Sequence, residues 1–106
     1  MAQFDDRKKS FEAKFAHDAE TQFKVEARRN RLLGEWAGDK LGKSGDERAA
    51  YAKEVVKADF QEQGDEDVFR KVRGDLGSDV SDEEIRSRMT QLRDEAKRQV
   101  MEEMGE

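Results

Sequence analysis

The acidic run Asp65-Glu66-Asp67 is the first of three places in the sequence where residue types could do chemistry. Successive carboxylates can bind calcium, but an EF-hand loop that starts at Asp65 needs glycine at its sixth position and glutamate at its twelfth. This chain has Arg70 and Leu76 there. The run is therefore interpreted as helix capping, because carboxylates are favoured at the positive end of a helix dipole.

The second place is the run Gly38-Asp39-Lys40-Leu41-Gly42-Lys43-Ser44, which contains the Gly-Lys-Ser letters of a phosphate-binding loop. Its two glycines are four positions apart, whereas the motif requires five, and no strand is expected before it. Nucleotide hydrolysis by this chain is therefore not expected.

The third is His17, the single histidine of a chain that contains no cysteine. Cysteine-ligated zinc, thiol nucleophiles and disulfides are excluded, and so is a histidine-rich metal cluster. An unperturbed histidine could act as a pH sensor, but a lone histidine is more often an ordinary helix or surface residue. The sequence thus predicts no catalytic apparatus and no metal site: the protein is not an enzyme and must act by binding something larger.

Composition indicates which elements carry these residues. The 106 residues fit one domain, and the absence of proline favours a chain that is helical almost throughout. No apolar stretch approaches the roughly 18 residues of a membrane span, and the N-terminus lacks the apolar core of a signal peptide, so a cytoplasmic protein is expected. A net charge of −5 argues against nucleic-acid binding.

Three helices are predicted after residue 43. Ser81 and Glu84 form a capping box before a helix over about 82–103, whose apolar positions recur on one face. Those positions are Ile85, Met89, Leu92, Ala96 and Val100. Ser44 and Glu47 form a second box before a helix over about 46–62, and the acidic run opens a third over about 66–75. The stripe expected to face the core in the 46–62 helix is Ala49, Ala52, Val56 and Phe60, widened by Val55.

A long helical segment precedes these three and ends near Gly42. Gly34, Gly38 and Gly42 share one of its faces, which favours close backbone packing against a neighbouring helix, or fraying toward the loop. Its apolar side is Phe23, Ala27, Leu33, Trp36, Ala37 and Leu41. Short connections favour antiparallel neighbours, so the fold class is all-α, a small four-helix bundle over residues 19–106.

Residues 1–18 have no evident place in the core of that bundle. Phe4, Phe11 and Phe15 lie on one helical stripe among charged residues. Two alternatives stay open: the segment extends the first helix and Phe15 docks on the bundle, or it is mobile or loosely packed and folds as a helix in a partner's groove. The residues expected to contact a partner are Phe4, Asp5, Asp6, Arg7, Phe11, Lys14 and Phe15.

The basic residues Arg28, Arg29 and Arg31 also have two interpretations. They form a solvated face or an acidic-partner contact, or they pair with acidic residues within the bundle, such as Asp59, Glu62 and Asp65.

Several long motifs carry a resemblance to a known family. They are Phe4-Asp5-Asp6-Arg7, Ala16-His17-Asp18-Ala19-Glu20, Phe23-Lys24-Val25-Glu26-Ala27-Arg28-Arg29-Asn30, Leu32-Leu33-Gly34, Glu54-Val55-Val56-Lys57-Ala58-Asp59-Phe60 and Gly64-Asp65-Glu66-Asp67-Val68. Over nearly its whole length the chain resembles the zeta subunit, the ATPase inhibitor of the alpha-proteobacterial F-type ATP synthase.

The resemblance implies a four-helix bundle whose N-terminal segment, here residues 1–18, enters the interface of the alpha, beta and gamma subunits as a helix. There it blocks rotation in the ATP-hydrolysing direction. The implied partners are these three subunits, the chain is expected to be a monomer, and it would meet the membrane only through the synthase. No cofactor is expected, apart from the weak adenine-nucleotide binding attributed to some members. The alternative is a non-catalytic helical adaptor or a nucleotide-sensing bundle with another protein partner.

Overall fold

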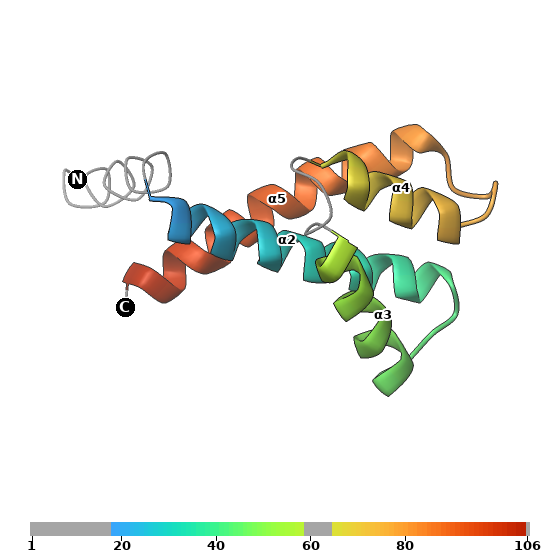
Figure 1. The fold of residues 1–106 in the computed structure, drawn as a ribbon, viewed down its shortest axis with the longest axis horizontal. Helices are drawn as coiled ribbons and strands as arrows, with labels where there is room; N and C mark the ends of the chain where they lie inside the picture. Colours follow the sequence, from blue (N-terminus) through green and yellow to red (C-terminus); the bar gives the residue numbers. More distant parts are fainter. Residues whose placement is uncertain (1–17, 59–64, 106) are drawn as a thin grey trace.

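The computed structural model describes residues 18–58 and 65–105, and within these ranges the chain forms four helices and no strand (Figure 1). The helices are α2 (Ala19–Lys40), α3 (Gly45–Ala58), α4 (Glu66–Asp75) and α5 (Asp82–Gly105). The predicted all-α four-helix fold is confirmed. Of the predicted N-terminal segment, only Asp18 belongs to the described residues.

Two side chains start helices by accepting from free backbone N–H groups. The Ser81 hydroxyl accepts from the Glu84 N–H at 3.1 Å, as the capping box predicted. Asp18 caps α2, because its Oδ1 accepts from Glu20 N–H at 3.0 Å and from Thr21 N–H at 3.3 Å. Asp18 therefore serves the folded helices, although the sequence assigned it to the N-terminal segment.

Two predicted helix starts differ from expectation. The Ser44 carbonyl, and not the hydroxyl, accepts from Glu47 N–H at 3.2 Å, beside Gly45 with a φ of +56°. The acidic run lies at the start of α4 as predicted, with Asp65 at the N-cap and Glu66 and Asp67 in the first turn, but the Asp65 side chain makes no capping bond. The helix predicted over 46–62 is described only as far as Ala58, and Phe60 lies outside the described residues.

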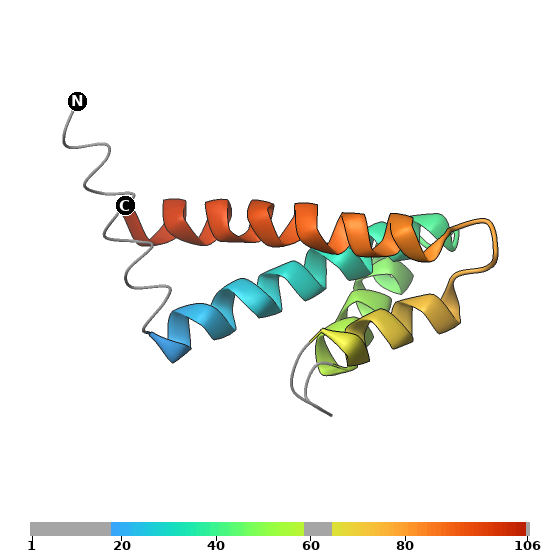
Figure 2. The ribbon, with the colours of Figure 1, turned by 90° about the horizontal axis from the view of Figure 1, so that it is seen from above.

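The α2 helix organises the fold, because it packs against each of the other three described helices. It runs antiparallel to α5: Arg28 lies 2.7 Å from Glu103, and near the opposite ends of the two helices Lys40 lies 3.6 Å from Glu84. Figure 2 shows α5 and α2 extending together beyond α3 and α4. None of the described helices is long and apolar enough to cross a bilayer.

Close approach of α3 to α2 depends on two of the three glycines that share a face. A Cβ added at Gly34 would lie 2.6 Å from the Ala52 Cα, and one at Gly38 would lie 3.3 Å from the Arg48 Cγ. The predicted close packing is therefore confirmed at these two positions. Gly42 meets nothing within 4 Å and instead takes a φ of +79° in the turn after α2.

Buried apolar side chains in the described ranges form a large core and a small one. The large core joins all four helices and the α4–α5 connection. It contains Leu33, Ala37, Tyr51, Val55, Val68, Phe69, Val72, Leu76, Val80, Ile85 and Met89. The small core lies between the first half of α2 and the second half of α5, and contains Val25, Ala96 and Val100.

One predicted core stripe, that of the 46–62 helix, is confirmed at Ala52 and Val55 and wrong at Ala49 and Val56. Ala49 is exposed and Val56 only half-buried, whereas Tyr51, Ala52 and Val55 are the buried side chains of α3. The helix is therefore rotated relative to the predicted stripe. Its displaced apolar residues stay on the surface, where they line a groove.

Candidate functional site

All seven residues predicted to contact a partner lie outside the described ranges. They are Phe4, Asp5, Asp6, Arg7, Phe11, Lys14 and Phe15. His17 also lies outside. What the structure describes is the point at which this segment joins the helices, and the surfaces around that point. Among the described residues, no group of histidine or acidic side chains is arranged to hold a metal ion.

The N-terminal segment joins the end of the molecule that contains the small core. Here α2 begins and α5 ends, so only two helices pack together (Figures 1 and 2). Phe23 lies one turn into α2 with a side chain that is 52% exposed, although the sequence placed it on the apolar side. A large exposed apolar side chain is a common feature of a binding surface.

Phe23 lines the first of two grooves, which has a volume of about 460 Å³. Its apolar lining comes from three helices and consists of Phe23, Ala27, Val56 and Val100. Its charged lining consists of Lys24, Arg28, Arg31 and Glu103. Arg28 is held in place across the groove, because it donates to Gln99 at 2.8 Å and to Glu103 at 2.7 Å.

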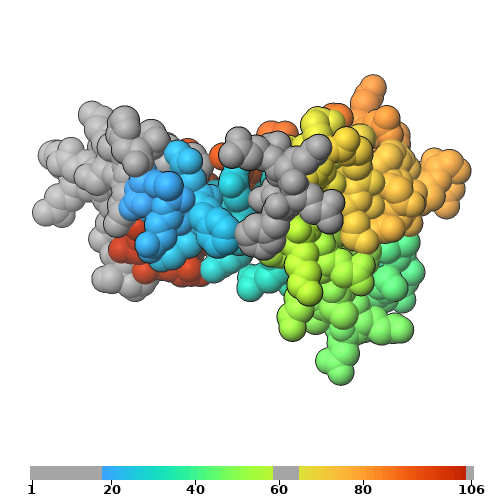
Figure 3. All heavy atoms as spheres, viewed as in Figure 1, coloured from blue at the N-terminus to red at the C-terminus, as the bar shows by residue number. Residues whose placement is uncertain are grey.

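The second groove lies between α2 and α3 and has a volume of about 310 Å³. Ala49, Ala52 and Val56 form its apolar lining, and its charged side chains are Arg31, Glu35, Lys53 and Lys57. Arg31 and Val56 line both grooves, so the two grooves adjoin each other. We call the two grooves together the groove face; in Figure 3 the molecule is indented between the first turns of α2 and the end of α3.

Positive charge dominates the groove face. The described side chains that line it include five basic residues and two acidic ones, a local balance of +3, whereas the whole chain carries −5. Within the part of the chain that the structure describes, Lys53 and Lys57 form no ion pair, and both are exposed. The sequence did signal the basic residues of α2, but it gave no sign that α3 would extend them.

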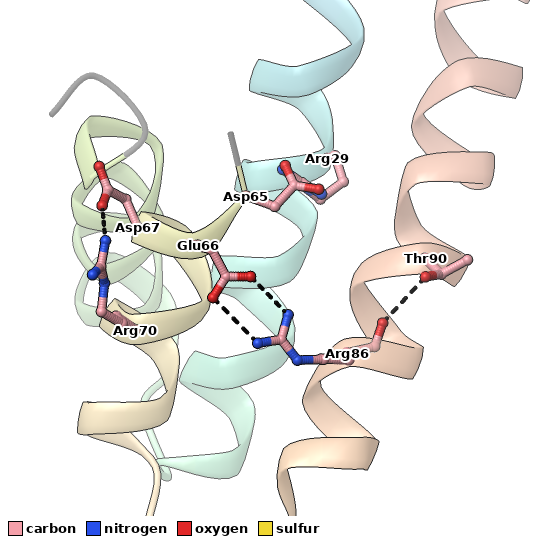
Figure 4. A network of polar contacts seen from close by, with 7 residues as sticks. All are labelled: Arg29, Asp65, Glu66, Asp67, Arg70, Arg86 and Thr90. Atoms are coloured by element: carbon pink, nitrogen blue, oxygen red, sulfur yellow. Dashed lines mark hydrogen bonds and ion pairs between the residues drawn. The ribbon is translucent and has the colours of Figure 1, made fainter. Parts of the chain in front are cut away.

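Arg29 has a different role from its neighbours Arg28 and Arg31. Its side chain is 1% exposed and donates to the Asn30 side chain at 2.7 Å. It also donates at 2.8 Å to Asp65, which lies beside it in Figure 4. The predicted pairing of this cluster with Asp65 is confirmed, and the solvated interpretation is wrong for Arg29. The hydrogen bond from Arg29 lowers the pKa of Asp65 below its usual value.

Further contacts hold α4 against its neighbours. Arg86 of α5 donates to both carboxylate oxygens of Glu66, at 3.1 and 3.3 Å (Figure 4). Its guanidinium also stacks 3.8 Å from the Phe69 ring centroid. The Tyr51 hydroxyl donates to Asp75 at 2.8 Å. Burial, together with this bond, raises the pKa of Tyr51, so the phenol stays a proton donor. These groups tie helices together and are satisfied by one another, which is a structural role.

Comparison with known proteins found one matching family model and a similar solved structure. A family model described as ATPase inhibitor subunit zeta matches residues 1–99. A structure solved by NMR in solution is similar at 57% sequence identity and a TM-score of 0.72, covering 77% of this chain and 96% of that one. Among curated proteins, no match was found.

Proposed function

The chain belongs to the family of ATPase inhibitor subunit zeta, and from this premise we propose that it inhibits ATP hydrolysis by the F-type ATP synthase. In the proposed mechanism, residues 1–18 insert as a helix at the interface of the alpha, beta and gamma subunits and block rotation. The observation that carries the proposal is the family match over residues 1–99, which includes this whole segment.

Such an inhibitor needs no chemistry of its own. A rotary enzyme turns over only while its catalytic sites change conformation in sequence, so a helix wedged between rotor and stator stops catalysis mechanically. An 18-residue helix would be about 27 Å long, which is enough to reach into a subunit interface. The described helices fit the role of a scaffold, because Arg29 and the Tyr51 hydroxyl form hydrogen bonds that join one helix to another part of the fold.

The energetics suit a reversible inhibitor. Burying the rings of Phe4, Phe11 and Phe15 would contribute roughly 1.5–3 kcal/mol each. Ordering the segment on binding would cost on the order of 2–5 kcal/mol. The balance favours binding without making it permanent. The same proposal has the chain act in the cytoplasm as a monomer that meets the membrane only through the synthase.

The proposal is tested by assaying ATP hydrolysis by the cognate F-type ATP synthase with purified chain added. We expect the wild-type chain to inhibit. A variant carrying Phe4→Ala, Phe11→Ala and Phe15→Ala should lose most inhibition, because it removes the apolar anchors and leaves the charges.

The matched control changes the same segment away from the aromatic stripe, with Lys9→Ala and Ser10→Ala, and should inhibit as the wild type does. If the wild-type chain does not inhibit, an adaptor or nucleotide-sensing role with another partner replaces the proposal. If the triple variant inhibits normally, the three phenylalanines are not the anchors.

A further inference from the structure

The groove face has features that an insertion mechanism at residues 1–18 does not use. It combines an apolar lining with a surplus of cations, and it lies on α2, α3 and α5, beside the helix end that the N-terminal segment joins. Scaffold helices that only carried the segment would need neither feature.

The apolar lining of the groove face is exposed to water in the free protein, which is energetically unfavourable. Phe23 is 52% exposed, and Val56, which lines both grooves, is only half-buried. Ala49 is exposed in the second groove. Continuous apolar surface that solvent reaches is characteristic of protein docking sites.

The cations lie along both sides of this lining. Lys24, Arg28 and Arg31 follow one stripe of α2 over about 10 Å, since each residue of a helix advances about 1.5 Å. Lys53 and Lys57 lie one turn apart on α3. An apolar groove between two basic edges is complementary to a helix with apolar side chains on one face and acidic side chains flanking them.

We infer that the groove face docks an acidic amphipathic helix of the ATP synthase and so holds the chain on its target while residues 1–18 inhibit it. This inference rests on the proposed function. It assigns the chain two contacts with the enzyme: one that blocks, made by the N-terminal segment, and one that anchors, made by α2, α3 and α5.

A second copy of the chain is a less suitable occupant than an acidic partner. In a twofold dimer the same patch contacts itself, so two surfaces that each carry a balance of +3 would face each other. Juxtaposed like charges oppose association. The acidic partner relieves this charge and covers the same apolar lining.

The test uses full-length variants of the chain. It measures the concentration of each variant that gives half-maximal inhibition of the cognate enzyme. Val56→Asp should raise this concentration about tenfold or more, because it puts a negative charge in the lining that faces an acidic helix. Val56→Lys, matched in position and polarity, should raise it much less. Lys53→Gln with Lys57→Gln should raise it about fivefold at low salt and flatten its salt dependence.

Two controls complete the experiment. Ser78→Glu with Ser87→Glu makes the same net-charge change at exposed positions away from the grooves and should leave the concentration unchanged. All variants should still inhibit fully at saturation, and their unfolding midpoints should match the wild type, since Val56 lies outside both cores.

The outcomes separate the two claims. If all groove variants reach half-maximal inhibition at the wild-type concentration, the anchoring inference is overturned and the proposed function stands. Equal losses for Val56→Asp and Val56→Lys would contradict an acidic occupant. A dimer in sedimentation that Val56→Asp dissociates would show that a second copy covers the face. Failure of the wild-type chain to inhibit would overturn the proposed function, and this inference with it.

Discussion

The two ends of the described helices are built for different tasks. At one end four helices enclose a core of large apolar side chains, reinforced by Glu66–Arg86 and Tyr51–Asp75 contacts between helices. At the other end only α2 and α5 meet, over a small core, and α2 begins there; the first groove extends from this end to Val56 of α3. The difference shows how a 106-residue chain can keep a stable fold while leaving apolar surface for a partner.

The largest expected difference between the two ends is in core stability. Val72 and Val25 are both 0% exposed, but Val72 belongs to the large core and Val25 to the small one. Val72→Ala should lower the free energy of unfolding by about 2–3 kcal/mol, and Val25→Ala by only about 1–1.5 kcal/mol. The loss is smaller for Val25→Ala because a contact between only two helices can collapse around the lost volume. Urea unfolding measures the free energy of unfolding of both variants.

Equal losses for the two valine substitutions would show that the small core is as tightly packed as the large one. The contrast between the two ends would then be one of size alone.

The next effect concerns the contact that places α3 against α2. Gly34→Ala should destabilise by about 2 kcal/mol, because its Cβ would lie 2.6 Å from the Ala52 Cα and neither backbone can yield without moving a helix. Gly74→Ala is the matched control in α4, where a Cβ meets nothing within 4 Å. It should stabilise by up to about 1 kcal/mol through helix propensity. Thermal unfolding of both variants is the measurement.

If Gly34→Ala proved neutral, the α2–α3 crossing would be adjustable. The shape of the second groove would then not be fixed by the fold, and the charge on Lys53 and Lys57 would have to account for any docking there.

The smallest expected effect concerns the ion pair between Arg29 and Asp65, which lies between the two ends. Arg29 is buried, but Asp65 is 48% exposed in its side chain, so solvent weakens their ion pair. Asp65→Asn should cost about 1 kcal/mol at neutral pH. Because the folded pKa of Asp65 is lowered, the pair stabilises the fold above the unfolded pKa, and this stabilisation is lost as pH falls through the folded pKa.

The measurement is the difference in unfolding free energy between wild type and Asp65→Asn as a function of pH. This difference should be constant near neutral pH and should shrink as the pH falls below 3.8, the pKa of an unperturbed aspartate. A difference that persisted unchanged in strong acid would mean that Asp65 acts through its shape, and not through its charge.

The helices were predictable where the signals are local. Ser81 with the periodic residues after it defines α5, and the start and end of α4 follow from the acidic run and the glycines. The pairing of Arg29 with Asp65 was one of two interpretations of the sequence, but the burial of Arg29 and not of Arg31 depends on how the helices pack. The orientation of α3 was not predictable either: apolar residues lie on more than one side of it, and only packing against α2 selects Tyr51 and Val55 over Ala49.

The candidate site divides in the same way. The aromatic stripe of Phe4, Phe11 and Phe15 is a sequence pattern, and its role stays a prediction. The groove face is a product of tertiary structure, because its lining comes from three helices. No periodicity within one segment could have indicated that Arg31 and Val56 would be shared between two grooves.

The central claim is that the N-terminal segment inhibits, while the helices from Asp18 onward fold without residues 1–17. Deleting residues 2–17 tests it most directly, because this deletion keeps the Asp18 cap of α2. Unfolding midpoint and inhibition of ATP hydrolysis would be measured on the same sample. We predict an unchanged midpoint and no inhibition. Undiminished inhibition by the shortened chain would contradict the claim.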